Sequence, residues 1–120
     1  MELPREATLL RIFLGESDEL EGEPVFRKIV LKAREMNLAG ATVLRGPMGF
    51  GANSRVHTTK LLELSTDLPI VVEIVDIAEK IQCILPFLDE AVAEGLITIE
   101  AVRVLWYRHN ENKVRPIEGS

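Results

Sequence analysis

The chain has few of the residues that build covalent frameworks or metal centres. Its 120 residues include one cysteine, Cys83, and two histidines, His57 and His109. A single cysteine excludes an internal disulfide framework and a zinc site made of several cysteines. No second histidine or cysteine lies at metal-ligand spacing from either histidine. We therefore expect no metal site and no bound cofactor.

Basic residues are also in the minority: the chain has 14 lysines and arginines against 19 aspartates and glutamates, and its net charge is −5. Proteins that bind nucleic acid polymers carry basic surfaces, so we expect no partner of that class. No apolar run approaches the roughly 20 residues of a membrane helix, and no secretory signal pattern is present. With 47% hydrophobic and 28% charged residues, the composition is typical of a single globular domain, which we expect to be soluble and cytoplasmic.

Motifs for catalysis are missing as well. The sequence contains no Ser/His/Asp arrangement, no Walker sequence and no HExxH. Cys83 falls between Ile81 and Ile84 in a helical pattern, so we expect a core or near-core thiol and not a nucleophile. Without an acid–base pair, we expect a binding protein and not an enzyme.

What the sequence does contain is an ordered series of strand and helix patterns. Apolar runs predict strands over residues 7–14, 41–44 and 69–77 and a last strand from Leu96 to about Arg108. Two apolar stripes at helical spacing predict helices: Phe26, Ile29, Val30 and Ala33, then Ile81, Ile84, Leu85, Leu88 and Val92. This order predicts an α+β, ferredoxin-like βαββαβ sandwich, an antiparallel four-stranded sheet with both helices on one face.

Two connecting segments are distinctive. Residues 16–23 are rich in acids, which we interpret as a solvated loop that favours the next helix N-terminus; the alternative is a calcium or magnesium site. Residues 46–67 form a connection of roughly 22 residues where about 4–6 are usual, and it opens with Gly46, Gly49 and Gly51. Such glycines either let backbone N–H groups hold an anion or serve as a plain hinge.

The predicted strands are apolar on both faces. In the third strand Ile70, Val72 and Ile74 oppose Val71 and Val75. Helices cover one face only, so the other face of a monomer would leave an apolar patch in water. We therefore expect the chain to associate with copies of itself.

The last strand brings cations and aromatics together. Arg103 and Arg108 lie beside Trp106 and Tyr107. Two arginines next to aromatic rings suit a phosphate and a base; the alternative is an amphipathic strand with its arginines in solvent or at a subunit seam.

Three segments carry a resemblance to a known family: L-R-G-P-M-G-F-G-A at 44–52, L-P-I-V-V-E-I-V-D at 68–76 and V-R-V-L-W-Y-R at 102–108. Through them the chain resembles the PII-like superfamily of small trimeric signalling proteins. It most resembles the branch called domain of unknown function 190, over about residues 6–109. The resemblance implies a homotrimer and a long functional loop after the second strand.

The resemblance also implies ligand-binding residues: Gly49, Gly51, Asn53, Arg103 and Arg108. The two glycines match the opening of the PII loop, and the two arginines match cations of the PII last strand. Asn53 falls where PII has a glutamine that holds magnesium and 2-oxoglutarate.

Other PII positions are changed. Ala52 replaces a nucleotide-contacting arginine, and Ile70 replaces the lysine that grips 2-oxoglutarate. The glycine-rich phosphate loop of PII is reduced to residues 93–96. The resemblance thus preserves the scaffold, the loop and part of the basic strand.

Taken with the resemblance, the sequence predicts one PII-like domain over residues 1–120, with an ordered core at about 6–109, a mobile loop at about 46–67 and a polar tail at 110–120. We expect a trimeric regulatory protein that binds a small anionic or nucleotide ligand at subunit clefts. Through its long loop it would contact a partner such as a membrane transporter. The alternative is a divalent-metal-handling protein similar to CutA, which shares this architecture.

Overall fold

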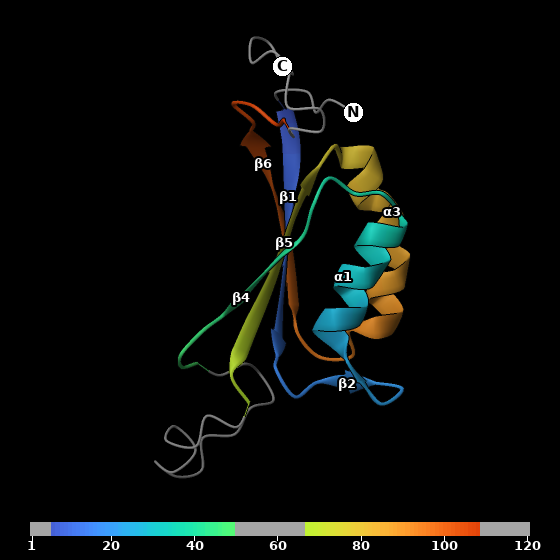
Figure 1. Cartoon of the computed structure of the whole chain (residues 1–120), viewed down its shortest axis with the longest axis vertical. Helices are drawn as coiled ribbons and strands as arrows, with labels where there is room; N and C mark the ends of the chain where they lie inside the picture. The colour runs from blue at the N-terminus through green and yellow to red at the C-terminus, as the bar shows by residue number, and fades with distance from the viewer. Residues whose placement is uncertain (1–5, 50–66, 109–120) are drawn as a thin grey trace.

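A four-stranded sheet with two helices on one face organises the chain (Figure 1). The computed structural model describes residues 6–49 and 67–108. Its elements are β1 (Glu6–Gly15), β2 (Glu19–Leu20), β3 (Glu23–Pro24), α1 (Val25–Glu35), β4 (Thr42–Arg45), β5 (Pro69–Asp76), α3 (Ala78–Ala91) and β6 (Leu96–Arg103). The predicted tail over 110–120 and most of the predicted loop over 46–67 lie outside the described residues.

The strands run in the order β4-β5-β1-β6, and every neighbouring pair is antiparallel. In Figure 1, α1 and α3 lie side by side against the same face of this sheet. The predicted ferredoxin-like βαββαβ arrangement is therefore confirmed.

The core lies between the helices and this face of the sheet. It is built by alternate residues of β1 and β5 and by one stripe of each helix, because side chains repeat every two residues in a strand and about every 3.6 in a helix. The buried core residues are Leu10, Ile12, Leu14, Val25, Ile29, Ala33, Ile70, Val72, Ile74, Ile81, Ile84, Leu88 and Ala91. Most residues of the two predicted stripes are among them, and the others pack against them.

The acidic segment differs from the predicted loop. Residues 19–24 form a two-stranded hairpin, β2 and β3, whose turn consists of Glu21 with φ 55° and Gly22 with φ 82°. Two successive residues with positive φ are the turn that suits the twist of a hairpin. Glycine adopts such a φ readily, whereas a glutamate rarely does. Gly22 is therefore typical of this turn, but Glu21 is not, and the sequence does not predict the hairpin.

Two further predictions are wrong. β6 ends at Arg103, which pairs with Glu6 at the start of β1, and the chain then leaves the sheet instead of continuing as a strand to Arg108. Cys83 is exposed and not part of the core. It lies two positions after Ile81, about 200° around the helix and hence on the opposite side.

Within the described ranges, no helix combines the length and the apolar composition needed to cross a membrane.

Candidate functional site

The long connection over 46–67 begins and ends beside the turn that follows β1. At its base, the N–H of Gly46 donates to the carbonyl of Pro69 at 2.8 Å. The N–H of Glu16 donates to the carbonyl of Leu68, also at 2.8 Å. These backbone bonds extend the sheet and hold the two ends of the connection together.

Side chains reinforce this base. The Asp67 carboxylate accepts the N–H of Ser17 at 2.9 Å, and the Arg45 guanidinium donates to the Glu16 carboxylate at 2.6 Å. The turn over 15–18 thus binds the connection on both sides. No motif in the sequence marks Asp67 or Glu16 for this role, since each partner lies 29 or 50 positions away.

The glycines at this base pack closely on a proline ring. A Cβ at Gly46 would lie 2.9 Å from Cγ of Pro69, and a Cβ at Gly49 would lie 3.1 Å from the same atom. Gly49 therefore serves close packing at the base, whatever it contributes to a ligand. Gly51 and Asn53 lie outside the described residues.

Of the two predicted arginines, one ends β6 and the other lies five positions further, in the segment that follows the strand. Arg103 is exposed and ends the strand. The guanidinium of Arg108 stacks on the indole of Trp106, 4.5 Å from the ring centroid. A guanidinium can bind a phosphate or carboxylate through two parallel hydrogen bonds, so this end of the sheet can hold an anion.

The structure does not bring Gly49 and these arginines together in one chain. Pro69, on which Gly49 packs, pairs with Gly15 at one end of β1, whereas Arg103 pairs with Glu6 at the other. The ten residues of β1 span about 30 Å at roughly 3.4 Å per residue. In Figure 1, β4 runs toward the bottom of the view and β6 ends near the top. A site containing both groups needs two copies of the chain.

The face of the sheet away from the helices, here called the open face, carries an apolar row across all four strands. Strand register aligns its members in the order Leu44, Val71, Phe13 and Leu96. Leu44, Phe13 and Leu96 are exposed large hydrophobic residues. Exposed apolar residues that form a continuous row are typical of a surface that another protein covers.

Beside the apolar row lies an ionic cluster centred on Arg11. Its Nε donates to Glu73 at 2.9 Å and its Nη1 donates to Glu100 at 3.1 Å. The hydrogen bond to Glu73 is the main cause of a raised pKa of Arg11. The cluster places one cation between two carboxylates in the middle of the open face, and its net charge is negative.

Other features of the described residues do not suit an anion or a metal. A hollow beside the β2–β3 hairpin and the end of α3 is lined by Asp18, Glu19 and Glu94, whose carboxylates repel anions. Residues 6–49 and 67–108 contain no group of three or more histidine, cysteine, aspartate or glutamate side chains placed to hold a metal ion. His57 and His109 lie outside these ranges.

Comparison with known proteins agrees with this architecture. The family DUF190, described as "Uncharacterized ACR", matches residues 7–104. A UPF0166 protein of Aquifex aeolicus is 42% identical over 100 residues, covering 82% of this chain and 92% of that protein.

Two solved structures share the fold. CPII of Thiomonas intermedia K12, bound to ADP, AMP and acetate, has a TM-score of 0.58 and 13% identity, covering 82% of this chain and 88% of CPII. A PII-like signaling protein of Thermus thermophilus has a TM-score of 0.52 and 17% identity, covering 88% of this chain and 92% of that protein. The chain therefore belongs to the DUF190 family and has the fold of the PII-like proteins.

Proposed function

We propose that this chain is a regulatory binding protein that holds a small anionic ligand, of the adenine-nucleotide class, between copies of itself. The observation that carries the proposal is the separation of Gly49 from Arg103, which lie at opposite ends of the sheet. Arg108 is on the Arg103 side, because the neighbouring Tyr107 contacts Ala39, which is hydrogen-bonded to Asp76 beside Thr8. A ligand that uses both ends must lie at a boundary between chains. The ADP, AMP and acetate bound by the similar CPII structure support this ligand class.

The assembly we propose is a cyclic homotrimer whose open faces pack together. The apolar row of Leu44, Val71, Phe13 and Leu96 supplies the area that association removes from water. In the Arg11 cluster the guanidinium is already paired with Glu73 and Glu100, so no unpaired cation enters the interface, although the second carboxylate leaves the cluster with one net negative charge. The number three rests on the PII resemblance.

We also propose that the long connection contacts a protein partner, such as a membrane transporter. The support is its length and its resemblance to the PII loop. Its base is held by Asp67, Ser17, Arg45 and Glu16, so both ends of the connection have a defined position on the sheet.

Calorimetric titration with ADP tests the proposed site. We expect the purified assembly to bind ADP and Arg108→Ala to weaken binding about tenfold or more, because a charge-assisted hydrogen bond to the ligand contributes about 1.5–3 kcal/mol. Arg27→Ala is the matched control, since Arg27 is exposed on the outer face of α1. Equal affinity of the Arg108→Ala and Arg27→Ala proteins would contradict the assignment.

Mixed assemblies test whether the site lies between chains. Arg108→Ala and Gly49→Val chains each lose one half of every site. When the two are unfolded and refolded together in equal amounts, random mixing in a closed ring regenerates about a quarter of the intact sites. A site within one chain would regain none, and that result would overturn the proposal.

A further inference from the structure

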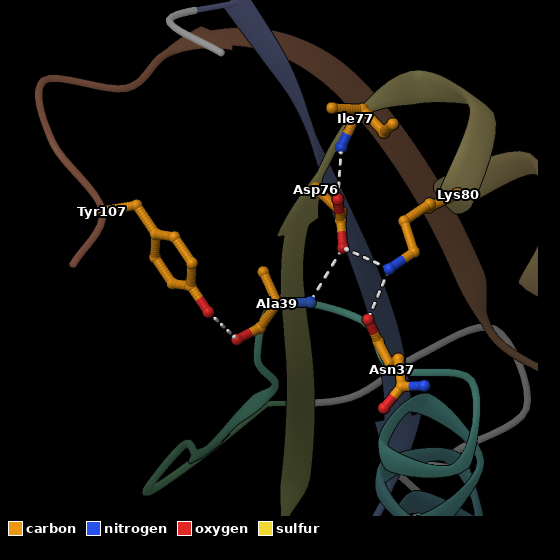
Figure 2. Close-up of polar contacts among 6 residues, drawn as sticks. All are labelled: Asn37, Ala39, Asp76, Ile77, Lys80 and Tyr107. Atoms are coloured by element: carbon orange, nitrogen blue, oxygen red, sulfur yellow. Dashed lines mark hydrogen bonds and ion pairs between the residues drawn. The ribbon is translucent and has the colours of Figure 1, made fainter. Parts of the chain in front are cut away.

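Asp76 is a fully buried carboxylate on the core face of β5, outside the site described above. Both of its oxygens are hydrogen-bonded (Figure 2): Oδ1 accepts the N–H of Ile77 at 2.7 Å, and Oδ2 accepts the N–H of Ala39 at 2.8 Å. The ammonium group of Lys80 lies 4.0 Å from Oδ2. A buried carboxylate is tolerated only with such partners, so these polar contacts define the structural role of Asp76.

The structural role of Asp76 is to hold the connection between α1 and β4 in place. Asp76 fixes Ala39 through its N–H, and Lys80 donates a hydrogen bond to the carbonyl of Asn37. The carbonyl of Ala39 is fixed from the other side, because it accepts the hydroxyl of Tyr107 at 2.9 Å. Figure 2 shows Asp76 and Tyr107 on opposite sides of Ala39.

Tyr107 belongs to residues 104–108, here called the C-terminal strap, which leaves the sheet after Arg103. The strap carries Trp106, whose side chain is 63% exposed, and Arg108, which stacks on it. The hydroxyl of Tyr107 crosses from β6, at one edge of the sheet, to the connection that leads into β4, at the other edge. It therefore ties the residues on either side of it to a fixed point of the fold.

We propose that Asp76, Ala39 and Tyr107 form a relay that positions the Arg108 guanidinium for the anionic ligand, with Asp76 and Tyr107 as positioning residues. This inference rests on the proposed function. A guanidinium must be held in place to make two parallel hydrogen bonds, and each ordered side chain costs conformational entropy. In the relay the strap is ordered before the ligand binds. Asp76 holds Ala39 through its N–H, the Ala39 carbonyl holds the Tyr107 hydroxyl, and Tyr107 in turn holds the strap that carries Arg108.

Tyr107→Phe tests the relay, because it removes the hydroxyl and keeps the ring. Trp106 is the only tryptophan of the chain, so its fluorescence reports on the strap alone. We expect acrylamide to quench Trp106 about twice as effectively in the variant, and the Kd for ADP to rise about fivefold, as the loss of one neutral hydrogen bond gives. Asp76→Asn should act in the same direction, since its amide NH2 cannot accept one of the two N–H groups.

Leu105→Ala is the control, because it shortens an exposed side chain of the same strap and leaves the Tyr107 hydroxyl in place. Equal effects of Tyr107→Phe and Leu105→Ala would overturn the relay, and so would a Tyr107→Phe protein with unchanged quenching. A variant that loosens Trp106 but keeps its ADP affinity would refute the positioning role. If the unmodified protein does not bind ADP, the proposed function fails for this ligand class. The quenching data then test separately whether Tyr107 holds the strap in place.

Discussion

The carboxylate of Asp67 occupies the space that a side chain at Gly15 would need. A Cβ at Gly15 would lie 2.5 Å from Oδ1 of Asp67, and this oxygen accepts the N–H of Ser17 at 2.9 Å. The missing side chain at the end of β1 therefore allows the end of the long connection to reach the turn over 15–18.

Gly15→Ala should lower the free energy of unfolding by about 1 kcal/mol, because the Asp67 carboxylate must move and release the Ser17 N–H. Asp67→Ala removes the same bond and clears the space, so adding Gly15→Ala to it should cost little. Urea unfolding of the two single variants and the double variant, against the unmodified chain, measures this coupling. A cost of Gly15→Ala that is the same in both backgrounds would contradict the contact.

Gly22 and Gly40 both have open space where a Cβ would be added, but only Gly22 has a positive φ, of 82°. Gly22→Ala should cost about 1–2 kcal/mol, because an L side chain is strained in the left-handed region. Gly40→Ala should be neutral or stabilise by about 0.4–1 kcal/mol through the unfolded state. Thermal melting of the two variants checks the difference, and equal melting temperatures would argue against the hairpin turn at Glu21 and Gly22.

Ile29 and Leu31 lie on opposite faces of α1, the first fully buried and the second 54% exposed. Ile29→Ala should cost about 2–5 kcal/mol, the usual range for emptying a core position. Leu31→Ala should change stability by less than about 0.5 kcal/mol, because the side chain is exposed and alanine favours helices. Chemical denaturation measures both values. A large loss of stability in Leu31→Ala would mean that the buried face of α1 has been assigned incorrectly.

Phe13→Lys should dissociate the proposed trimer, because it puts a charge into the apolar row of the open face. Light scattering should then report the 13.4 kDa monomer in place of a particle three times that mass. Leu31→Lys, which introduces the same charge on the outer face of α1, is the control and should leave the mass unchanged. A Phe13→Lys protein that keeps the full mass would exclude the open face as the interface.

Periodicity explains which parts of the fold are predictable. The helical stripes around Ile29 and Ile84 are local patterns, and the structure buries them or packs them against the core as predicted. The two opposing faces of β5 are predicted as well, but only the structure shows that Ile70, Val72 and Ile74 form the buried one. The prediction for Cys83 is wrong because proximity to Ile81 and Ile84 along the chain does not give the same angle around the helix. The predicted length of β6 is wrong because strand-forming composition continues beyond Arg103, where the chain turns toward Ala39.

By itself, then, the sequence determined the order of the two helices and the four strands of the main sheet, the apolar stripe that each helix buries and the family to which the chain belongs, because these depend on residues close together along the chain. Only the tertiary structure decided which distant residues meet. Strand order brings Tyr107 to Ala39, 68 positions away, and Ala39 to Asp76, 37 positions away. The same strand register places Gly49 and Arg103 at opposite ends of β1, because antiparallel pairing sets each residue's position along the sheet by its partner and not by its place in the sequence.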